Sequence, residues 1–278
     1  MTKIAFQGAF GANSDMACRA VFPDCETLPC FGFDDAFAAV RAGEADLAMI
    51  PVENSVAGRV ADVHHLLPQG GLHIIGEHYQ PIQHHLLAIK GAALQDITRV
   101  ESHVQALAQC RVWLKEHNIR PVIHADTAGA AEEVSQRGDK TVAAIASDLA
   151  GKIYGLESLA TNIADGPKNT TRFLILSREA KQAAPQTDCV TTLVFRVRSV
   201  PAALYKAMGG FATNGVNITK LESYLVDGNF TAAQFYVDVE GHPQDTPLRL
   251  ALEELSFFAH ETAILGVYPA HPFRRKQA

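Results

Sequence analysis

The first 180 residues alternate between short apolar runs and amphipathic stretches, the pattern of strands followed by helices. Strands are predicted at residues 3–8, 46–51, 100–102, 121–124, 141–146 and 172–176, and a long extended segment at 72–90 is interrupted by Pro81. Helices are predicted at 13–20, 34–43 and 104–117, where Leu107 and Leu114 recur at helical spacing. This alternation predicts α/β layers with mostly parallel strands.

The pattern changes near residue 180. Residues 181–188 are polar and contain a proline, so they are predicted to be a linker. Beyond them the sequence predicts a strand at 190–198, a helix at 202–214, strands at 217–226 and 229–239, a helix at 246–260 and a strand at 263–268. Asp227-Gly228 is a hairpin signal between the two middle strands. The order βαββαβ is that of a ferredoxin-like unit, and residues 271–278 are predicted to be a tail.

Composition narrows the class of protein. The chain has 278 residues, 47% of them hydrophobic, which is enough for two domains with sizeable cores. A net charge of -6 disfavours a nucleic-acid partner or an acidic membrane surface. Neither an export signal nor a membrane-spanning stretch is predicted. The cysteines number five, at irregular spacing, which predicts reduced thiols in the cytoplasm rather than a disulfide framework.

Polar side chains recur where predicted strands meet the starts of helices. They are Glu53, Asn54 and Ser55 after one strand, Ser102 and His103 after another, Asp126 and Thr127 after a third, and Asn169, Thr170, Thr171 and Arg172 at the start of a fourth. Each group alone is explained by helix capping, and Ser102 is a predicted N-cap. Their repetition favours an anion-binding site, because helix starts expose free N–H groups. Arg172 either pairs with a substrate carboxylate or forms a salt bridge at a strand edge.

No metal or cofactor is predicted. His64-His65 and His84-His85 are adjacent pairs, and neighbours on a strand or helix point in different directions. The sequence contains no HExxH, CxxC, GxSxG, Walker loop or complete GxGxxG. Cys110 lies on the apolar stripe of its predicted helix, which favours packing over nucleophilic catalysis.

Together these motifs resemble the prephenate dehydratase family. The segments "FQGAFGANS", "IPVENSVAG", "SHVQALAQC", "DTAGAA" and "NTTRF" match its catalytic-domain motifs in order, over residues 1 to about 178. The βαββαβ unit, with "NITKLES", resembles the ACT regulatory domain that follows in this family. The resemblance implies a catalytic domain at 1–180 with two lobes arranged like a periplasmic binding protein. Lobe 1 would comprise about 1–78 and 161–180, lobe 2 would comprise 79–160, and the ACT domain would cover 189–270.

The resemblance also implies an activity, the decarboxylating dehydration of prephenate to phenylpyruvate in L-phenylalanine biosynthesis, in a homodimer or homotetramer. It makes Thr171 the catalytic hydroxyl, and Glu53, which titrates, is the second candidate. The implied substrate-binding residues are Asn54, Ser55, Ser102, Gln105, Thr127, Thr170, Arg172 and Phe173, and adjacency adds Asn169. Arogenate as the substrate, or a non-catalytic small-molecule sensor, are the alternatives.

The resemblance places a phenylalanine effector site in the ACT domain, at Ala202, Ala203, Leu204, Asn217, Leu221, Glu222 and Ser223. Two departures from the family pattern bear on it. Ala202 stands where the family has glycine, and an added methyl obstructs close approach of a ligand. Tyr224-Leu225 replace Arg-Pro, which removes a fixed positive charge. We therefore expect weak inhibition by phenylalanine.

Overall fold

The computed structural model describes residues 1–166, 168–198, 200–226 and 229–276. The chain forms two compact units. Met1–Val60 and His78–Phe173 make up the first, and Ala61–Glu77 joins the chain from Leu174 onward in the second. These units divide the chain at other residues than the domain limits expected from the sequence, since residues 61–77 group with the C-terminal segment. The expected limits stay a prediction.

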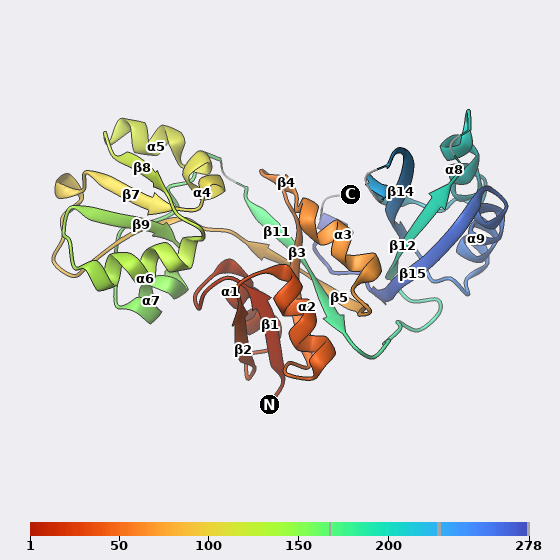
Figure 1. The fold of residues 1–278 in the computed structure, drawn as a ribbon, viewed down its shortest axis with the longest axis horizontal. Coiled ribbons are helices and arrows are strands. Elements are labelled where there is room, and N and C mark those ends of the chain that lie inside the picture. The colour runs from red at the N-terminus through yellow and green to blue at the C-terminus, as the bar shows by residue number, and fades with distance from the viewer. Residues whose placement is uncertain (167, 199, 227–228, 277–278) are drawn as a thin grey trace. The chain divides into compact units, whose positions relative to one another are not determined.

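The first unit contains a mixed sheet. Its strands lie in the order β11, β3, β1, β2, with β4 paired antiparallel to β3. The bounds are β1 Lys3–Gln7, β2 Glu26–Cys30, β3 Leu47–Asn54, β4 Gly58–Arg59 and β11 Thr170–Ser177, the last of which continues into the second unit. Helices α1 (Asn13–Val21) and α2 (Phe33–Ala42) pack on this sheet (Figure 1). Hydrogen bonds between Ser55 and Thr170 place the carboxyl end of β3 beside the beginning of β11.

A second, mixed sheet completes the first unit. Its order is β10, β6, β9, β7, β8, with bounds Glu157–Ala160, His85–Ala88, Val142–Ala146, Arg99–Ser102 and Arg120–Ile123. Every residue of β9 is buried, as expected for a central strand covered on both faces. Helices α4 (Val104–Gln109) and α5 (Arg111–Glu116) lie on one side, and α6 (Thr127–Arg137) and α7 (Asp148–Tyr154) on the other (Figure 1). A short 3-10 turn, η1, covers Leu94–Asp96.

The single helix predicted at 104–117 is wrong, because the structure has two short helices that meet at Cys110. The Asp165 carboxylate accepts hydrogen bonds from the backbone N–H groups of Val112 and Trp113, which gives α5 its own start. Strand β2 and helix α3 (Ala61–Gln69) lie in stretches for which the hydrophobic pattern gave no prediction. Pro68 lies inside α3.

The second unit confirms the predicted order βαββαβ. Its elements are β12 Cys189–Val197, α8 Ala203–Thr213, β13 Ile218–Val226, β14 Asn229–Glu240, α9 Thr246–Phe258 and β15 Ala259–Pro269. The sheet order is β13, β14, β12, β15, followed by β5 (His73–Pro81). A Cβ on Gly266 would lie 2.2 Å from the Ile74 carbonyl oxygen, so only glycine allows β15 to approach β5 there. The hairpin turn predicted at Asp227-Gly228 lies outside the described residues.

Helix α3 packs in the second unit through two histidine rings. His64 meets Tyr236 edge-on at 5.0 Å, and His65 meets Tyr224 at 5.2 Å. The adjacent histidines therefore contact different tyrosines, as helical geometry requires. Across the described chain, no three His, Cys, Asp or Glu side chains gather as a metal ion would need.

The first residues of the segment predicted to be a tail, 271–278, make side-chain contacts within the second unit. Arg274 begins a short 3-10 turn, η2 (Arg274–Lys276), and forms a two-point ion pair with the buried Glu77 carboxylate. Arg275 pairs with Asp188. Of the helices described, none is long and apolar enough to cross a membrane.

Candidate active site

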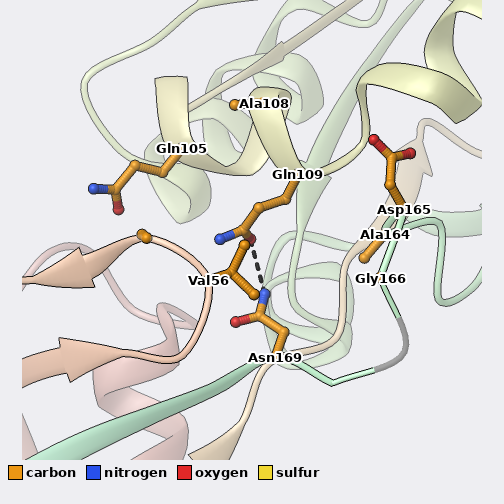
Figure 2. A pocket seen from close by; sticks show the side chains of 9 residues that line it. Val56, Gln105, Ala108, Gln109, Ala164, Asp165, Gly166 and Asn169 are labelled. Atoms are coloured by element: carbon orange, nitrogen blue, oxygen red, sulfur yellow. Dashed lines mark hydrogen bonds between the residues drawn. The ribbon is translucent and has the colours of Figure 1, made fainter.

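A cavity of about 330 Å³ opens within the first unit (Figure 2). Three segments line it: the loop after β3, helix α4 and the segment before β11. The lining residues are Val56, Ala57, Gln105, Ala108, Gln109, Ala164, Asp165, Gly166 and Asn169. Small apolar side chains form most of the wall, and carboxamides and the Asp165 carboxylate supply its polar groups. Of the sequence-predicted residues, the lining includes Gln105 and Asn169.

Asn54 connects this cavity to Thr171. The Asn54 Oδ1 accepts hydrogen bonds from the backbone N–H groups of Val56, at 2.9 Å, and Ala57, at 2.8 Å. Because a backbone N–H can only donate, these two bonds fix which end of the carboxamide is oxygen. Asn54 Nδ2 then donates to Asn169 Oδ1 at 2.7 Å and to Thr171 Oγ1 at 2.9 Å.

The Thr171 hydroxyl is therefore an acceptor from Asn54. A hydroxyl carries one proton and two lone pairs, so its own proton is directed to another group. Thr171 is 9% exposed. It is separated from the cavity wall by one carboxamide, since both Thr171 and the wall residue Asn169 accept from Asn54 Nδ2.

The same donor-to-acceptor direction continues from Asn169 to Gln109 in the cavity wall. Asn169 Nδ2 donates to Gln109 Oε1 at 2.8 Å, and Figure 2 shows the two carboxamides facing each other. Gln109 Oε1 also lies 2.7 Å from His84 Nε2. Among the described residues the Gln109 amide nitrogen has no hydrogen-bond partner, and it points away from Asn169. Burial lowers the pKa of His84, which favours the neutral ring.

Ser55 and Thr170 join the end of β3 to the start of β11. The Ser55 N–H donates to the Thr170 carbonyl oxygen at 2.9 Å, and the Thr170 N–H donates to Ser55 Oγ at 3.0 Å. Two reciprocal bonds hold the strand ends in register. The Asn54 and Thr171 side chains meet because of this pairing.

Glu53 and Arg172 form an ion pair between the same strands. Arg172 Nη1 donates to Glu53 Oε1 at 3.0 Å, and the Arg172 side chain is 2% exposed. Of the two roles left open for Arg172, the structure contains the salt bridge. Neither residue lines the cavity.

Three other predicted residues lie away from the cavity wall. The fully buried Ser102 hydroxyl donates to the Ile145 carbonyl at 2.6 Å, so Ser102 is not the N-cap of α4. That position belongs to His103, whose ring accepts from the Gln105 N–H. Thr127 is the first residue of α6, which Asp126 caps, and Phe173 is packed in the core.

The sequence reasoning missed Gln109 and Asp165. Gln105 and Gln109 stand four residues apart on α4 and thus share a face, a spacing that would have pointed to Gln109. No sequence pattern pointed to Asp165. Its carboxylate caps α5, and the start of α5 at Arg111 was not predicted because the apolar residues continue at helical spacing across it. Among the described lining residues Asp165 is the charged one, and both its oxygens accept from the α5 N–H groups.

The predicted effector residues lie at the start of α8, along β13 and, for Asn217, directly before β13. Ala202 has φ 60° and ψ 15°, the left-handed conformation that favours glycine. Asn217 donates to Glu240 at 3.0 Å, and Lys220 pairs with Glu222 at 3.2 Å. Leu221 is exposed. Ala203 and Leu204 begin α8, and Ser223 lies in β13.

Comparison with known proteins points to one family. The family model described as prephenate dehydratase matches residues 4–181. A bifunctional N-acyl-homoserine lactone acylase/prephenate dehydratase from Komagataeibacter europaeus is 54% identical over 98% of each chain. Arogenate dehydratase/prephenate dehydratase 1, chloroplastic, from Arabidopsis thaliana is 42% identical over 96% of this chain and 72% of the relative. A solved prephenate dehydratase in complex with L-Phe, from Arthrobacter aurescens, has a TM-score of 0.89 at 34% identity, over 97% of this chain and 90% of that one.

Proposed function

Because the chain belongs to the prephenate dehydratase family, we propose that it converts prephenate to phenylpyruvate, carbon dioxide and water, as a carbon-oxygen lyase. The observation that carries the proposal is the hydrogen bond from Asn54 Nδ2 to Thr171 Oγ1. It leaves the Thr171 proton for a leaving group next to a cavity of substrate size.

The reaction itself defines what the site must supply. The ring carboxylate leaves as carbon dioxide, and its bonding electrons enter the ring as the ring hydroxyl departs with one proton. Prephenate dianion plus one proton thus gives phenylpyruvate monoanion, carbon dioxide and water. Aromatisation drives the change, so the residues need only hold the substrate and deliver that proton. A positioned proton donor contributes roughly 10²–10⁴-fold.

Thr171 is the proposed proton donor. Asn54 donates to the same oxygen, which stabilises the negative charge that develops as the proton leaves, and solvent restores the proton afterwards. Glu53 remains the second candidate. Its ion pair with Arg172 favours the charged carboxylate, which has no proton to give, so it argues for Thr171.

The carboxamide nitrogens of Gln105 and Gln109 are the proposed donors to the substrate carboxylates. Both side chains line the cavity from α4. Asn169, Ser55 and Thr170 shape the wall by fixing the ends of β3 and β11. Roles for Ser102, Thr127, Arg172 and Phe173 in substrate binding remain predictions, which a prephenate complex would test.

We assign the βαββαβ unit to the ACT domain and propose that it mediates oligomerisation in a cytoplasmic homodimer or homotetramer. The related Arthrobacter enzyme was solved with L-Phe, which supports phenylalanine as an effector here as well. Ala202 and Tyr224-Leu225 argue for weak inhibition. Potent inhibition by micromolar phenylalanine would contradict this assignment.

Arogenate is the alternative substrate, because the Arabidopsis relative is named for both activities. Arogenate carries an amine where prephenate has a keto group, so it calls for an acceptor. Asp165 supplies the lining carboxylate among the described residues, but its oxygens already accept from the α5 N–H groups, which leaves fewer lone pairs for an ammonium group. This capping favours prephenate.

Acyl-homoserine lactone hydrolysis is a second candidate activity. It is favoured by the 54% identity, over 98% of each chain, to the bifunctional Komagataeibacter protein. Incubation with acyl-homoserine lactones, followed by detection of the free fatty acid, tests it. A Thr171→Ala variant in the same assay shows whether the two reactions share a site.

The decisive experiment mixes purified protein with prephenate and follows phenylpyruvate by its absorbance. Arogenate, with detection of phenylalanine, is the parallel arm. Turnover of prephenate supports the proposal. Tight binding of prephenate without any product would instead support a non-catalytic sensor.

A further inference from the structure

His84 lies outside the cavity wall but contacts it through Gln109. It belongs to the segment between β5 and β6, and its ring is buried, with 3% of the residue exposed. Its Nε2 is 2.7 Å from Gln109 Oε1. No role proposed above uses this histidine.

The polarity of this contact follows from the carboxamides next to it. Asn169 Oδ1 accepts from Asn54, so Asn169 Nδ2 is the atom that donates to Gln109 Oε1. The Gln109 oxygen thus faces both Asn169 and His84. Two acceptors cannot share a hydrogen bond, so the proton of the neutral His84 ring must be on Nε2.

We propose that His84 is a positioning residue: by donating from Nε2 to Gln109 Oε1, it keeps the Gln109 amide nitrogen turned into the cavity. This inference rests on the proposed function, in which that nitrogen binds a substrate carboxylate. With Asn169 as its single partner, the Gln109 oxygen would be held by one bond instead of two. The carboxamide would then turn and present its oxygen to an anionic substrate.

The backbone on both sides holds this geometry. The His84 carbonyl accepts from the Ile163 N–H at 3.0 Å, and the Ile82 N–H donates to the Asn169 carbonyl at 2.8 Å. The two segments that connect the sheets of the first unit are thus bonded to each other on either side of the carboxamides. His84 holds Gln109 from one connecting segment, and Asn169 holds it from the other.

Two substitutions separate positioning from packing. His84→Leu fills a similar volume but has no donor, whereas His84→Gln carries an N–H that reaches the position of Nε2. We expect His84→Leu to raise KM for prephenate about tenfold, with kcat changed by less than about threefold, since binding of the ground state and of the transition state weakens equally. His84→Gln should stay within about threefold of the wild type in both constants. Circular dichroism and thermal unfolding establish that each variant is folded.

The Gln109→Ala background provides the matched control. Once the carboxamide is removed, His84→Leu should change KM by less than about twofold, because nothing is left to position. An equal loss in both backgrounds, or no rescue by His84→Gln, would overturn the inference and leave His84 a core residue. If the wild type does not dehydrate prephenate, the proposed function fails, and ¹⁵N NMR of the histidines still decides the positioning. A proton on Nε2 of His84 supports it, and a proton on Nδ1 refutes it.

Discussion

In the hydrogen bond between Asn54 and Thr171 the proton comes from the Asn54 amide, so the Thr171 hydroxyl keeps its own proton for another group. We expect Thr171→Ala to lower kcat by about 10²–10⁴-fold while prephenate binding is nearly kept, since the methyl group that replaces the hydroxyl has no proton to transfer. Steady-state kinetics with prephenate and a direct binding measurement test this. Thr171→Ser is the matched control and should retain most of the activity. Normal turnover by Thr171→Ala, together with an inactive Glu53→Gln, would transfer the role to Glu53.

Asn54 determines the direction of every bond in the carboxamide chain. In Asn54→Asp the shape is kept, and one carboxylate oxygen still accepts from the Val56 and Ala57 N–H groups. The other oxygen then faces Asn169 Oδ1 and Thr171 Oγ1 without a proton to donate, so the Thr171 hydroxyl turns toward it. We expect kcat to fall about 10²-fold or more, as for loss of one donor to a developing oxyanion. A kcat within threefold of the wild type would show that the Asn54 N–H groups are not required.

Burial lowers the pKa of His84 and of His85, so both rings resist protonation in the folded state. The unfolded chain then binds more protons as the pH falls, so the free energy of unfolding should decrease below a pH of about 6.5, the ordinary histidine value. His84→Gln removes the His84 contribution and should make this decrease shallower. Urea unfolding of both proteins at pH 5 and pH 7 measures the difference. An equal decrease in the free energy of unfolding from pH 7 to pH 5 in the two proteins would mean that His84 is protonated equally in the folded and unfolded states.

Among the elements, helix α8 begins under strain. Its N-cap, Ala202, has φ 60°, which costs a residue with a Cβ about 1–2 kcal/mol. Glycine removes that strain but loses about 0.5–1 kcal/mol of backbone entropy, so Ala202→Gly should raise the free energy of unfolding by up to about 1.5 kcal/mol. Ala203→Gly, one residue inside the helix, is the control and should not stabilise. Chemical denaturation compares the two.

The hydrophobic pattern predicted those elements whose apolar residues keep either strand or helical spacing from end to end. The βαββαβ order of the second unit was found in this way, because α8 buries Ala207 and Phe211, and α9 buries Leu248, Ala251 and Leu255, at helical spacing. Periodicity failed at Cys110, where the apolar stripe continues across a break that a distant carboxylate, Asp165, creates. It gave no signal for α3, whose buried face carries His64 against Tyr236.

The candidate site shows the same limit. Motifs in the sequence pointed to Asn54 and Thr171, and adjacency pointed to Asn169; the structure joins the three in one hydrogen-bonded cluster. Gln109 was missed because it stands at the end of a helix that was predicted too long. The pairing of Arg172 with Glu53 could not be derived, since it depends on which strands lie side by side.

At the scale of the whole molecule, the two compact units are not continuous stretches of the chain. Residues 61–77 follow the first four strands in sequence but belong to the second unit, where β5 pairs with β15. Glu77 ends this stretch, and its carboxylate is buried. A buried charge requires a partner, and the chain supplies one from its far end. Arg274 donates from Nε to Glu77 Oε1 at 2.6 Å and from Nη2 to Glu77 Oε2 at 2.9 Å.

This ion pair leads to a prediction about the cohesion of the second unit. Arg274 also donates to Thr219 Oγ1 in β13 and lies 3.9 Å from the buried Asp238 carboxylate in β14, so one guanidinium connects β5, β13 and β14. Removal of one member of a buried pair costs about 3–5 kcal/mol, and we expect Arg274→Ala to lower the free energy of unfolding by that amount. Arg274→Lys keeps the charge but loses the two-point hydrogen bonding of the guanidinium, so its free energy of unfolding should lie between those of the wild type and Arg274→Ala.

Arg275 offers the matched control, because it is the next residue and also forms an ion pair, with Asp188, but its side chain is 75% exposed. Exposed pairs contribute about 0–1 kcal/mol, so Arg275→Ala should scarcely change stability. Urea denaturation, followed by the fluorescence of tyrosines in the second unit, compares the two alanine variants. Equal effects would show that the C-terminal segment is held by general packing. A large loss confined to Arg274→Ala would show that Arg274 completes the second unit by neutralising Glu77.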